Sequence, residues 1–371
     1  MKFSCSQQNL TKALNTVSKA VTSRTTIPIL KGILLKVDED GKLTMAASDL
    51  DISIEKTLEV DDFIPGEIVV QAKLFSEIIR KLPSSNVTIN AEGENVLITC
   101  ASSEFNILGL APDEFPNINI EIKENEKISF EKETLKDMIR KTAFAASIDE
   151  TRGVITGVLV EMKERKLNMV SLDGFRMAVS REDIINGKEQ NIIIPAKILN
   201  EISKIITEEE GESQDVSMYI SEKRAIFIID DSKVVLRLLE GQFVDYNGIL
   251  PKDSKVRIVV NKADLLESIE RASLLAKVGK NNLIKLDIKD STMEITSKSE
   301  EGNVKEDVII SKEGEDLTIG FNSKYMIDAL KAIDDEEIAM YFNTSISPCL
   351  IKPIAGDSYE YLVLPVRITN N

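Results

Sequence analysis

The chain has 371 residues, which is too long for one ordinary hydrophobic core and suggests about three domains. It is 43% hydrophobic and 29% charged, and no apolar run approaches the roughly 18 residues of a membrane helix, which argues against a bilayer-spanning protein. Its net charge of −16 repels phosphate at a distance, so any contact with nucleic acid must be local.

The N-terminal segment MKFSCSQQNL has no apolar stretch behind Lys2, so we expect no secretory signal and a cytoplasmic protein. Cys5, Cys100 and Cys349 are far apart and odd in number, a pattern typical of buried free thiols in a reducing compartment. Without any histidine, the chain cannot form Ser-His-Asp or Cys-His catalytic systems, and most zinc sites are excluded as well.

The first element in chain order is a short strand followed by a helix, and it recurs twice. The opening 17 residues align with residues 126–142 and 255–272, and apolar residues match at two positions of each helix: Leu10, Leu135 and Leu265, then Leu14, Ile139 and Ile269. Ser6 and Asn261 are candidate helix caps.

Next come three alternating strands, at residues 32–55 and again at 157–180, with a weaker third copy. A second strand-and-helix unit follows at residues 67–82, 191–206 and 316–333, and further strands come after each copy. Each third is thus expected to contain two helices and six to eight strands. This organisation predicts an α+β fold of three similar domains, each a duplicated β-α-β-β-β unit, at residues 1–122, 123–250 and 251–371. The boundaries fall in polar stretches near residues 118–128 and 250–255, and three-domain arcs of this kind are expected to close by two-fold association.

The second helix of each third repeats its positive charges. Lys73, Lys197 and Lys324 share one repeat position, and Arg80, Lys204 and Lys331 share another, seven residues later. Seven residues are about two turns, so each pair lies on one helix face, expected to be opposite Leu74 and Ile78. One such helix would ordinarily be a solvated face. Three matched placements in an acidic chain favour a surface that meets the phosphates of nucleic acid.

An enzyme is the main alternative class. The chain has neither GxxxxGK[ST] nor GxGxxG, so the usual nucleotide cradles are absent. Magnesium chemistry at Asp49 with Asp51, or at Asp61 with Asp62, remains open, although turn residues are the favoured interpretation. The acidic run at 207–213 is expected to be a solvated loop. A second alternative is a ring or scaffold that does not encircle DNA.

Five segments, in this order and spacing, give the chain its resemblance to the bacterial β sliding clamps: SRTTIPIL (23–30), FPN (115–117), LDGFRMAV (172–179), GQFVDYNGILP (241–251) and YLVLPVRI (361–368). The resemblance covers the whole chain. It implies a non-catalytic processivity subunit of DNA polymerase III that needs no cofactor or metal. It further implies a head-to-tail homodimer forming a ring around duplex DNA without sequence specificity, and short peptide motifs that tether the replicative polymerase, the clamp loader and repair proteins.

The resemblance also implies three sets of residues. The DNA contacts would be Arg24, Lys73, Arg152 and Lys197, to which repeat equivalence adds Lys324, with Arg80, Lys204 and Lys331 on the same helix faces. The dimer interface would pair Phe105 and Ile107 with Leu274 and Leu275. The partner-peptide pocket would comprise Ile155, Leu172, Gly174, Phe175, Arg176, Met177, Val244, Gly248, Ile249, Ile346, Pro348, Leu362, Val363, Leu364, Pro365, Val366, Arg367 and Ile368.

Three pocket positions depart from the family pattern. Better-known members carry His at Phe175, Pro at Val244 and Arg at Gly248, which leaves the peptide preference of this chain open. Either Arg176 or Arg367 is expected to orient the polar groups of a bound peptide.

Overall fold

The computed structural model describes residues 1–22, 24–118, 120, 122, 127–184, 189–207, 213–279 and 281–368. The chain divides into two compact units: residues 1–132 with 204–238, and residues 133–203 with 239–371. The expected boundary near residues 118–128 and the acidic run at 207–213 lie largely outside the described residues, and the three domain boundaries stay a prediction.

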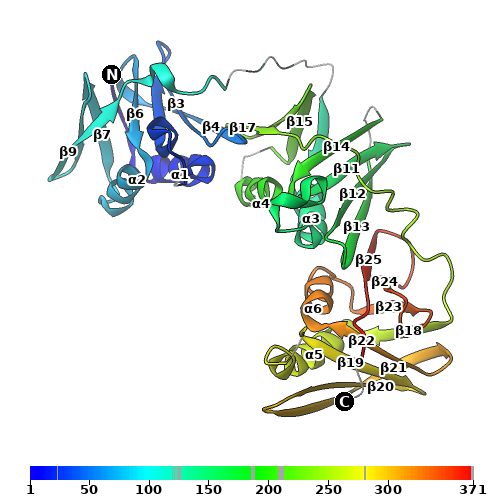
Figure 1. Ribbon diagram of the computed structural model, residues 1–371. Helices are drawn as coiled ribbons and strands as arrows, with labels where there is room; N and C mark the ends of the chain where they lie inside the picture. Colours follow the sequence, from blue (N-terminus) through cyan, green and yellow to red (C-terminus); the bar gives the residue numbers. More distant parts are fainter. Residues whose placement is uncertain are drawn as a thin grey trace. The chain divides into compact units, whose positions relative to one another are not determined.

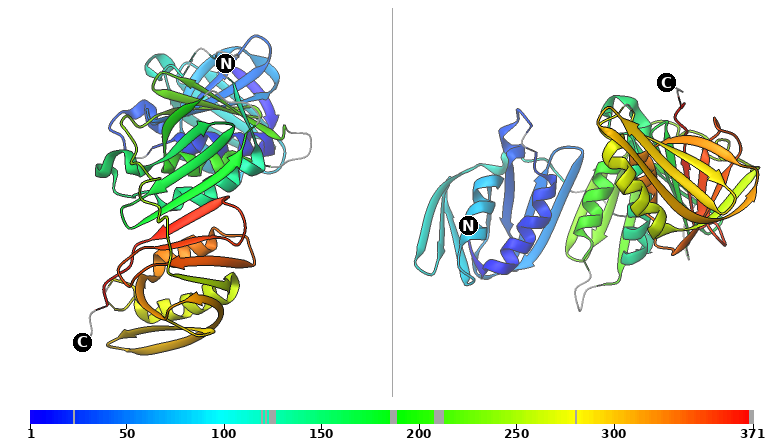
Figure 2. Two further views of the ribbon diagram at one scale, coloured as in Figure 1. Left: turned by 90° about the vertical axis from the view of Figure 1, so that its right-hand side faces the viewer. Right: turned by 90° about the horizontal axis from the view of Figure 1, so that it is seen from below.

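The first unit is built on one antiparallel sheet with the strand order β10-β15-β16-β17-β4-β3-β2-β6-β9-β8-β7-β1-β5. Helices α1 (Gln7–Val17) and α2 (Ala72–Lys81) lie side by side on it (Figures 1 and 2). The strands are β1 (Lys2–Ser6), β2 (Gly32–Val37), β3 (Lys42–Ser48), β4 (Ile52–Glu59), β5 (Asp61–Ile64), β6 (Gly66–Gln71), β7 (Asn86–Glu92), β8 (Asn95–Cys100), β9 (Ser103–Leu110), β10 (Ile128–Glu131), β15 (Asp215–Ser221), β16 (Arg224–Ile229) and β17 (Ser232–Arg237).

The second unit has a sheet with the order β14-β11-β12-β13-β25-β24-β23-β18-β21-β20-β19-β22. It carries most of α3 (Lys132–Thr142) and α4 (Ala196–Ile205), and all of α5 (Lys262–Ala276) and α6 (Ser323–Lys331). The strands are β11 (Gly157–Lys163), β12 (Lys166–Leu172), β13 (Arg176–Asp183), β14 (Gln190–Pro195), β18 (Val256–Asn261), β19 (Leu283–Lys289), β20 (Thr292–Ser299), β21 (Gly302–Gly314), β22 (Leu317–Asn322), β23 (Glu337–Phe342), β24 (Cys349–Pro353) and β25 (Tyr359–Val363).

The repeated helix pattern is confirmed. The six matched apolar positions of α1, α3 and α5 are all buried, at 4% exposure or less. Ser6 and Asn261 cap their helices by accepting the backbone N–H of Asn9 (3.2 Å) and Asp264 (3.1 Å). The weak third copy of the three-strand block is present as β19, β20 and β21. Periodicity and capping therefore identified the helices correctly, because both are local properties of the chain.

Each sheet continues from one third of the chain into the next through a pair of antiparallel strands. Strand β4 of the first third pairs with β17 of the middle third, and β13 of the middle third pairs with β25 of the last. We call these the first and second strand joints. They explain why half of the middle third groups with each neighbour, since hydrogen bonds across a joint bind it as firmly as any other strand pair.

Two expectations about the first third were wrong. Among the described residues it has nine strands rather than six to eight, because Asp61 and Asp62 form part of the edge strand β5 instead of a turn. Asp49 does stand in a turn, where its Oδ1 accepts the backbone N–H groups of Asp51 and Ile52.

All three cysteines are free and buried, as expected. No helix among the described residues is long and apolar enough to cross a membrane.

Candidate functional site

The segment Asp173–Arg176 forms a tight turn between β12 and β13. Oδ1 of Asp173 accepts the backbone N–H groups of Phe175 (2.8 Å) and Arg176 (3.0 Å). Gly174 has a φ of +88°, and a Cβ atom added there would lie 3.1 Å from Nη2 of Arg152. Glycine is therefore suited to this position for both its backbone conformation and its close neighbour. The turn fixes where the side chains of Phe175 and Arg176 begin.

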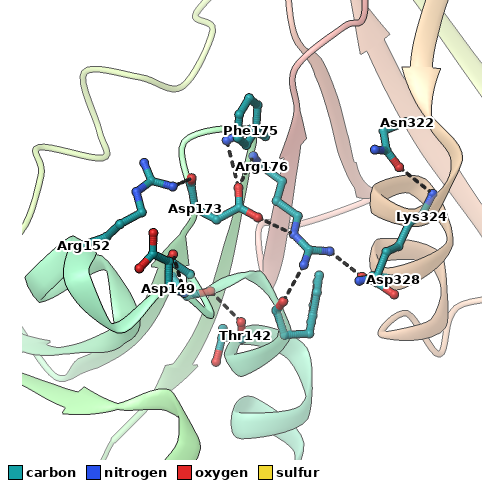
Figure 3. A network of polar contacts seen from close by, with 12 residues as sticks. Thr142, Asp149, Arg152, Asp173, Phe175, Arg176, Asn322, Lys324 and Asp328 are labelled. Atoms are coloured by element: carbon teal, nitrogen blue, oxygen red, sulfur yellow. Dashed lines mark hydrogen bonds and ion pairs between the residues drawn. The ribbon is translucent and has the colours of Figure 1, made fainter. Parts of the chain in front are cut away.

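Arg176 is buried, with 8% exposure, and each of its nitrogens already donates a hydrogen bond. Nε donates to Oδ2 of Asp173 (3.1 Å), Nη1 to Oδ2 of Asp328 (2.5 Å) and Nη2 to the carbonyl oxygen of Phe144 (2.8 Å), as Figure 3 shows. The guanidinium also lies 4.7 Å from the ring centre of Tyr325. Three of its five guanidinium N–H donors thus hold the protein itself together, and its expected role of orienting a peptide's polar groups stays a prediction.

Phe175 points out of the same turn and is 55% exposed. Its ring stacks on Tyr325 with 6.2 Å between ring centres, and its carbonyl oxygen accepts the backbone N–H of Leu364 at 2.8 Å. Leu364 is itself 37% exposed. Two apolar side chains are thus presented to solvent from a backbone held by hydrogen bonds on both sides.

The other residues of the expected pocket divide into a buried base and an exposed set. Leu172, Met177 and Leu362 are buried in one cluster, with Ile155 packed against it and Val363 buried beside Leu362. The chain segments that carry the remaining residues join this cluster through Phe243, Tyr246, Leu250 and Leu350. Exposed or half-buried are Val244, Gly248, Ile249, Ile346, Pro348, Pro365, Val366, Arg367 and Ile368.

Beyond Leu364, the tail (residues 365–368) lies along the edge strand β22. The backbone N–H of Val366 donates to the carbonyl oxygen of Gly320 at 2.8 Å. A Cβ at Gly320 would lie 2.8 Å from the carbonyl oxygen of Val366 and 2.9 Å from Cγ1 of Ile368. Glycine here permits the close approach of residues 366–368 to β22.

Sequence reasoning missed the residues that support this surface: Phe144, Asp173, Tyr325 and Asp328. Asp173 lies inside the LDGFRMAV segment, and Asp328 stands one helical turn after Lys324, a spacing that signals an ion pair. Neither signal reveals Arg176 as the shared partner, because Asp328 is 152 residues away in the chain. Burial raises the pKa of the Tyr325 hydroxyl, and the Asp173 carboxylate adds to the effect.

All eight expected DNA contacts are exposed: Arg24, Lys73, Arg80, Arg152, Lys197, Lys204, Lys324 and Lys331. Several also contact the protein. Arg80 donates to Oδ1 of Asn15 at 2.9 Å, and Lys331 pairs with Glu270 at 2.8 Å. These are the same contact at equivalent repeat positions, joining α2 to α1 and α6 to α5. The second cation of these helices therefore also holds a helix pair together.

The first cations of the helices are arranged differently. Lys324 pairs with Asp328 at 2.9 Å. Arg152, which precedes β11 and is not on these helices, donates to the carbonyl oxygen of Asp173 at 2.5 Å. On α2 the expected opposition of Lys73 and Leu74 was wrong. Leu74 is 42% exposed on the same side as Lys73, and the buried face carries Phe75, Ile78 and Ile79.

The expected interface residues lie at exposed places in their own units. Phe105 on β9 is 39% exposed and Leu274 near the end of α5 is 66% exposed, while Ile107 and Leu275 are half-buried. Two more apolar side chains face solvent nearby in the sequence or on β21: Leu108 on β9 at 74% and Ile309 on β21 at 84%. Exposed apolar positions of this kind are typical of surfaces that another chain covers.

Sequence models of the DNA polymerase III beta subunit match this chain in three parts: the N-terminal domain at residues 1–119, the central domain at 129–245 and the C-terminal domain at 247–367. The beta sliding clamp of Bacillus subtilis (strain 168) is 39% identical over 381 residues, which cover 99% of this chain and 100% of that protein.

Solved structures agree with the sequence matches. A putative DNA polymerase III beta subunit from Eubacterium rectale has a TM-score of 0.93 at 39% identity, with 99% of each chain covered. The DNA polymerase sliding clamp from Bacillus subtilis has a TM-score of 0.94 at 37% identity, with 100% of each chain covered. With all three domains matched along its length, the chain belongs to the DNA polymerase III beta subunit family, the beta sliding clamps.

Proposed function

We propose that this protein is a DNA sliding clamp, a non-catalytic ring that encircles duplex DNA and tethers the replicative DNA polymerase and other replication and repair proteins. The observation that carries the proposal is the full-length match to beta sliding clamps in all three repeats of one chain. The residues of this chain further support three parts of the proposed function: ring closure, contact with DNA and partner binding.

Ring closure by two copies is supported by the strand joints within one chain. At the first joint, Ile54 of β4 lies opposite Val234 of β17, and both are fully buried. At the second joint, Ala178 and Tyr361 lie opposite each other and are buried too. Each joint therefore covers an apolar pair from two neighbouring thirds.

Among the described residues, 103–108 of β9 and 302–309 of β21 pair with a strand on one side only. Aligning the β3–β4 hairpin with β20–β21 places Val304 at the position of Ile54, and aligning β16–β17 with β8–β9 places Phe105 at the position of Val234. Val304 and Phe105 are exposed or half-buried here. A third joint, β9 of one copy against β21 of a second, would bury both and close a head-to-tail dimer.

The charges at this third joint are complementary. Lys233 and Glu55 lie opposite each other at the first joint, 3.8 Å apart. The same alignment places Glu104 at the position of Lys233 and Lys305 at that of Glu55. The pair is reversed in sign and keeps its attraction, which favours this register over one that would set like charges opposite.

Contact with DNA is assigned to the exposed cations Arg24, Lys73, Arg152, Lys197 and Lys324, with Arg80, Lys204 and Lys331 beside them. In a chain of net charge −16, local cations at repeated positions are what binding to phosphates requires. Phosphate contacts carry no sequence information, in keeping with a protein that slides.

Partner binding is assigned to the exposed apolar set around Phe175 and Leu364, with the buried cluster of Leu172, Met177 and Leu362 beneath it. Large apolar residues of a short peptide gain most of their binding free energy on such a surface. Phe175 and its stacked neighbour Tyr325 add an aromatic wall, which suits an aromatic or leucine anchor.

Retention on circular and linear DNA tests the proposal. The protein is loaded onto a nicked circular plasmid by its clamp loader and separated from free protein by gel filtration, before and after one restriction cut. We expect it to stay on the circle and to leave the linear molecule. Equal retention on both forms would favour a protein that binds DNA without encircling it.

A further inference from the structure

Two of the proposed DNA contacts are connected to the turn that shapes the proposed partner surface, one directly and one through an ion pair. Arg152 lies against this turn and donates to the carbonyl oxygen of Asp173. Lys324 approaches from α6, where it pairs with Asp328, and Asp328 in turn binds Arg176 (Figure 3). A few polar contacts thus join the proposed DNA contacts to the proposed partner surface.

Asp328 is the centre of this connection because one oxygen serves two cations. Its Oδ2 lies 2.9 Å from Nζ of Lys324 and 2.5 Å from Nη1 of Arg176. The Lys324 side chain is 62% exposed, whereas that of Arg176 is 8% exposed. Anything that draws Lys324 toward solvent leaves the carboxylate to Arg176 alone.

Loss of the Lys324–Asp328 ion pair would affect the turn through Arg176. It binds Oδ2 of Asp173, whose Oδ1 holds the backbone N–H groups of Phe175 and Arg176. The carbonyl oxygen of Phe175 then holds the backbone N–H of Leu364. A continuous series of hydrogen bonds and ion pairs therefore runs from the Lys324 ammonium group to the backbones of Phe175 and Leu364.

The connection is specific to the second strand joint. The first joint has the same Asp turn, but Ile52 stands at the position of Arg176 and Leu50 at that of Gly174. An isoleucine cannot bind a carboxylate. On α2, Lys73 has Glu77 one turn later, as Lys324 has Asp328, but among the described residues no ion pair joins Glu77 to an arginine.

The geometry points to a coupling device: binding of duplex phosphates at Lys324 strengthens the binding of partner peptides at Phe175 and Leu364, acting through Asp328 and Arg176. This inference rests on the proposed function and adds regulation to it. A phosphate competes with Asp328 for Lys324, and the released carboxylate binds Arg176 more tightly. A more rigid turn then loses less conformational freedom when a peptide binds. Coupling of this kind is reciprocal between the two ligands.

The test is a titration of the full-length protein with a labelled peptide that carries glutamine and leucine/phenylalanine anchors. The dissociation constant is measured at low salt with and without a saturating linear duplex. We expect the duplex to lower the constant of the wild type about 3- to 10-fold, within the usual range of coupling between two sites. In Asp328→Asn the duplex should leave the constant unchanged. Lys324→Ala should bind the peptide as tightly as the duplex-bound wild type, with or without duplex.

Lys73→Ala is the matched control, because it removes a cation at the same repeat position without touching Asp328. Its affinity for duplex should fall with the lost phosphate contact, but at saturating duplex its peptide dissociation constant should respond as in the wild type. If Lys73→Ala loses the response as Lys324→Ala does, or if the wild type binds both ligands without any response, the coupling is wrong and the proposed function stands. If the wild type binds neither peptide nor duplex, the proposed function itself fails, and the coupling fails with it.

Discussion

Arg176 and Asp328 are 152 residues apart in the sequence, yet Nη1 of Arg176 lies 2.5 Å from Oδ2 of Asp328. This ion pair connects the turn after β12 to helix α6. With the contacts to Asp173 and Phe144, it makes a buried guanidinium part of the framework of the second unit.

Arg176→Ala should lower the free energy of unfolding by roughly 3 kcal/mol, because it leaves the buried carboxylate of Asp173 without its cation and Asp328 with Lys324 alone. Urea unfolding followed by circular dichroism measures the change. Lys331→Ala, which removes the exposed pair with Glu270, is the control and should cost less than about 1 kcal/mol. Equal costs for the two variants would contradict the framework role of Arg176.

Ile107→Asp or Leu274→Asp should convert the dimer to monomers. Burying an apolar side chain of this size at an interface is worth roughly 1.5 to 3 kcal/mol, and a carboxylate there would be desolvated as well. Sedimentation velocity gives the oligomeric state. Ile148→Asp serves as the control, since Ile148 is fully exposed and lies outside the proposed joint. Persistence of the dimer in both variants would place the interface elsewhere.

Glu104→Lys should weaken the dimer, because it sets a lysine opposite Lys305 at the proposed third joint. Combining it with Lys305→Glu should restore the dimer to within a few tenths of a kcal/mol of the wild type. Dissociation constants from analytical ultracentrifugation over a dilution series test the register. A double variant no tighter than Glu104→Lys alone would mean that the two residues are not opposite each other.

Replacing Lys73, Lys197 and Lys324 together by Glu should weaken DNA binding and flatten its dependence on salt. Each lysine that no longer neutralises a phosphate reduces the slope of log K against log salt by about 0.9. Fluorescence anisotropy with a labelled duplex at several salt concentrations measures this slope, and the dimer should remain intact. An unchanged slope would show that these lysines are merely solvated.

Leu364→Asp should abolish binding of the partner peptide while leaving the dimer and its retention on circular DNA intact. The side chain is exposed, so the change costs little stability, but it places a carboxylate where an apolar anchor would be buried. Ile354→Asp is a control on an apolar residue of similar exposure outside the proposed surface. A peptide that bound both variants and the wild type equally would remove this assignment.

The amino-acid sequence by itself determined the three-fold repeat, the helices with their caps and buried faces, and the matched cations on α2, α4 and α6. These depend on short-range periodicity and on self-similarity, which are legible without a fold. The same local reasoning wrongly placed Leu74 on the buried face of α2, because the face that a short helix buries depends on the residues that pack against it.

Only the tertiary structure decided what joins the repeats. The pairing of β4 with β17 and of β13 with β25 brings together strands that are distant in sequence, and hydrogen bonds between backbones leave no mark in residue order. For the same reason the burial of Arg176 could not be predicted from the sequence. Its burial depends on Asp328 and Tyr325, which approach it only when α6 packs beside the turn.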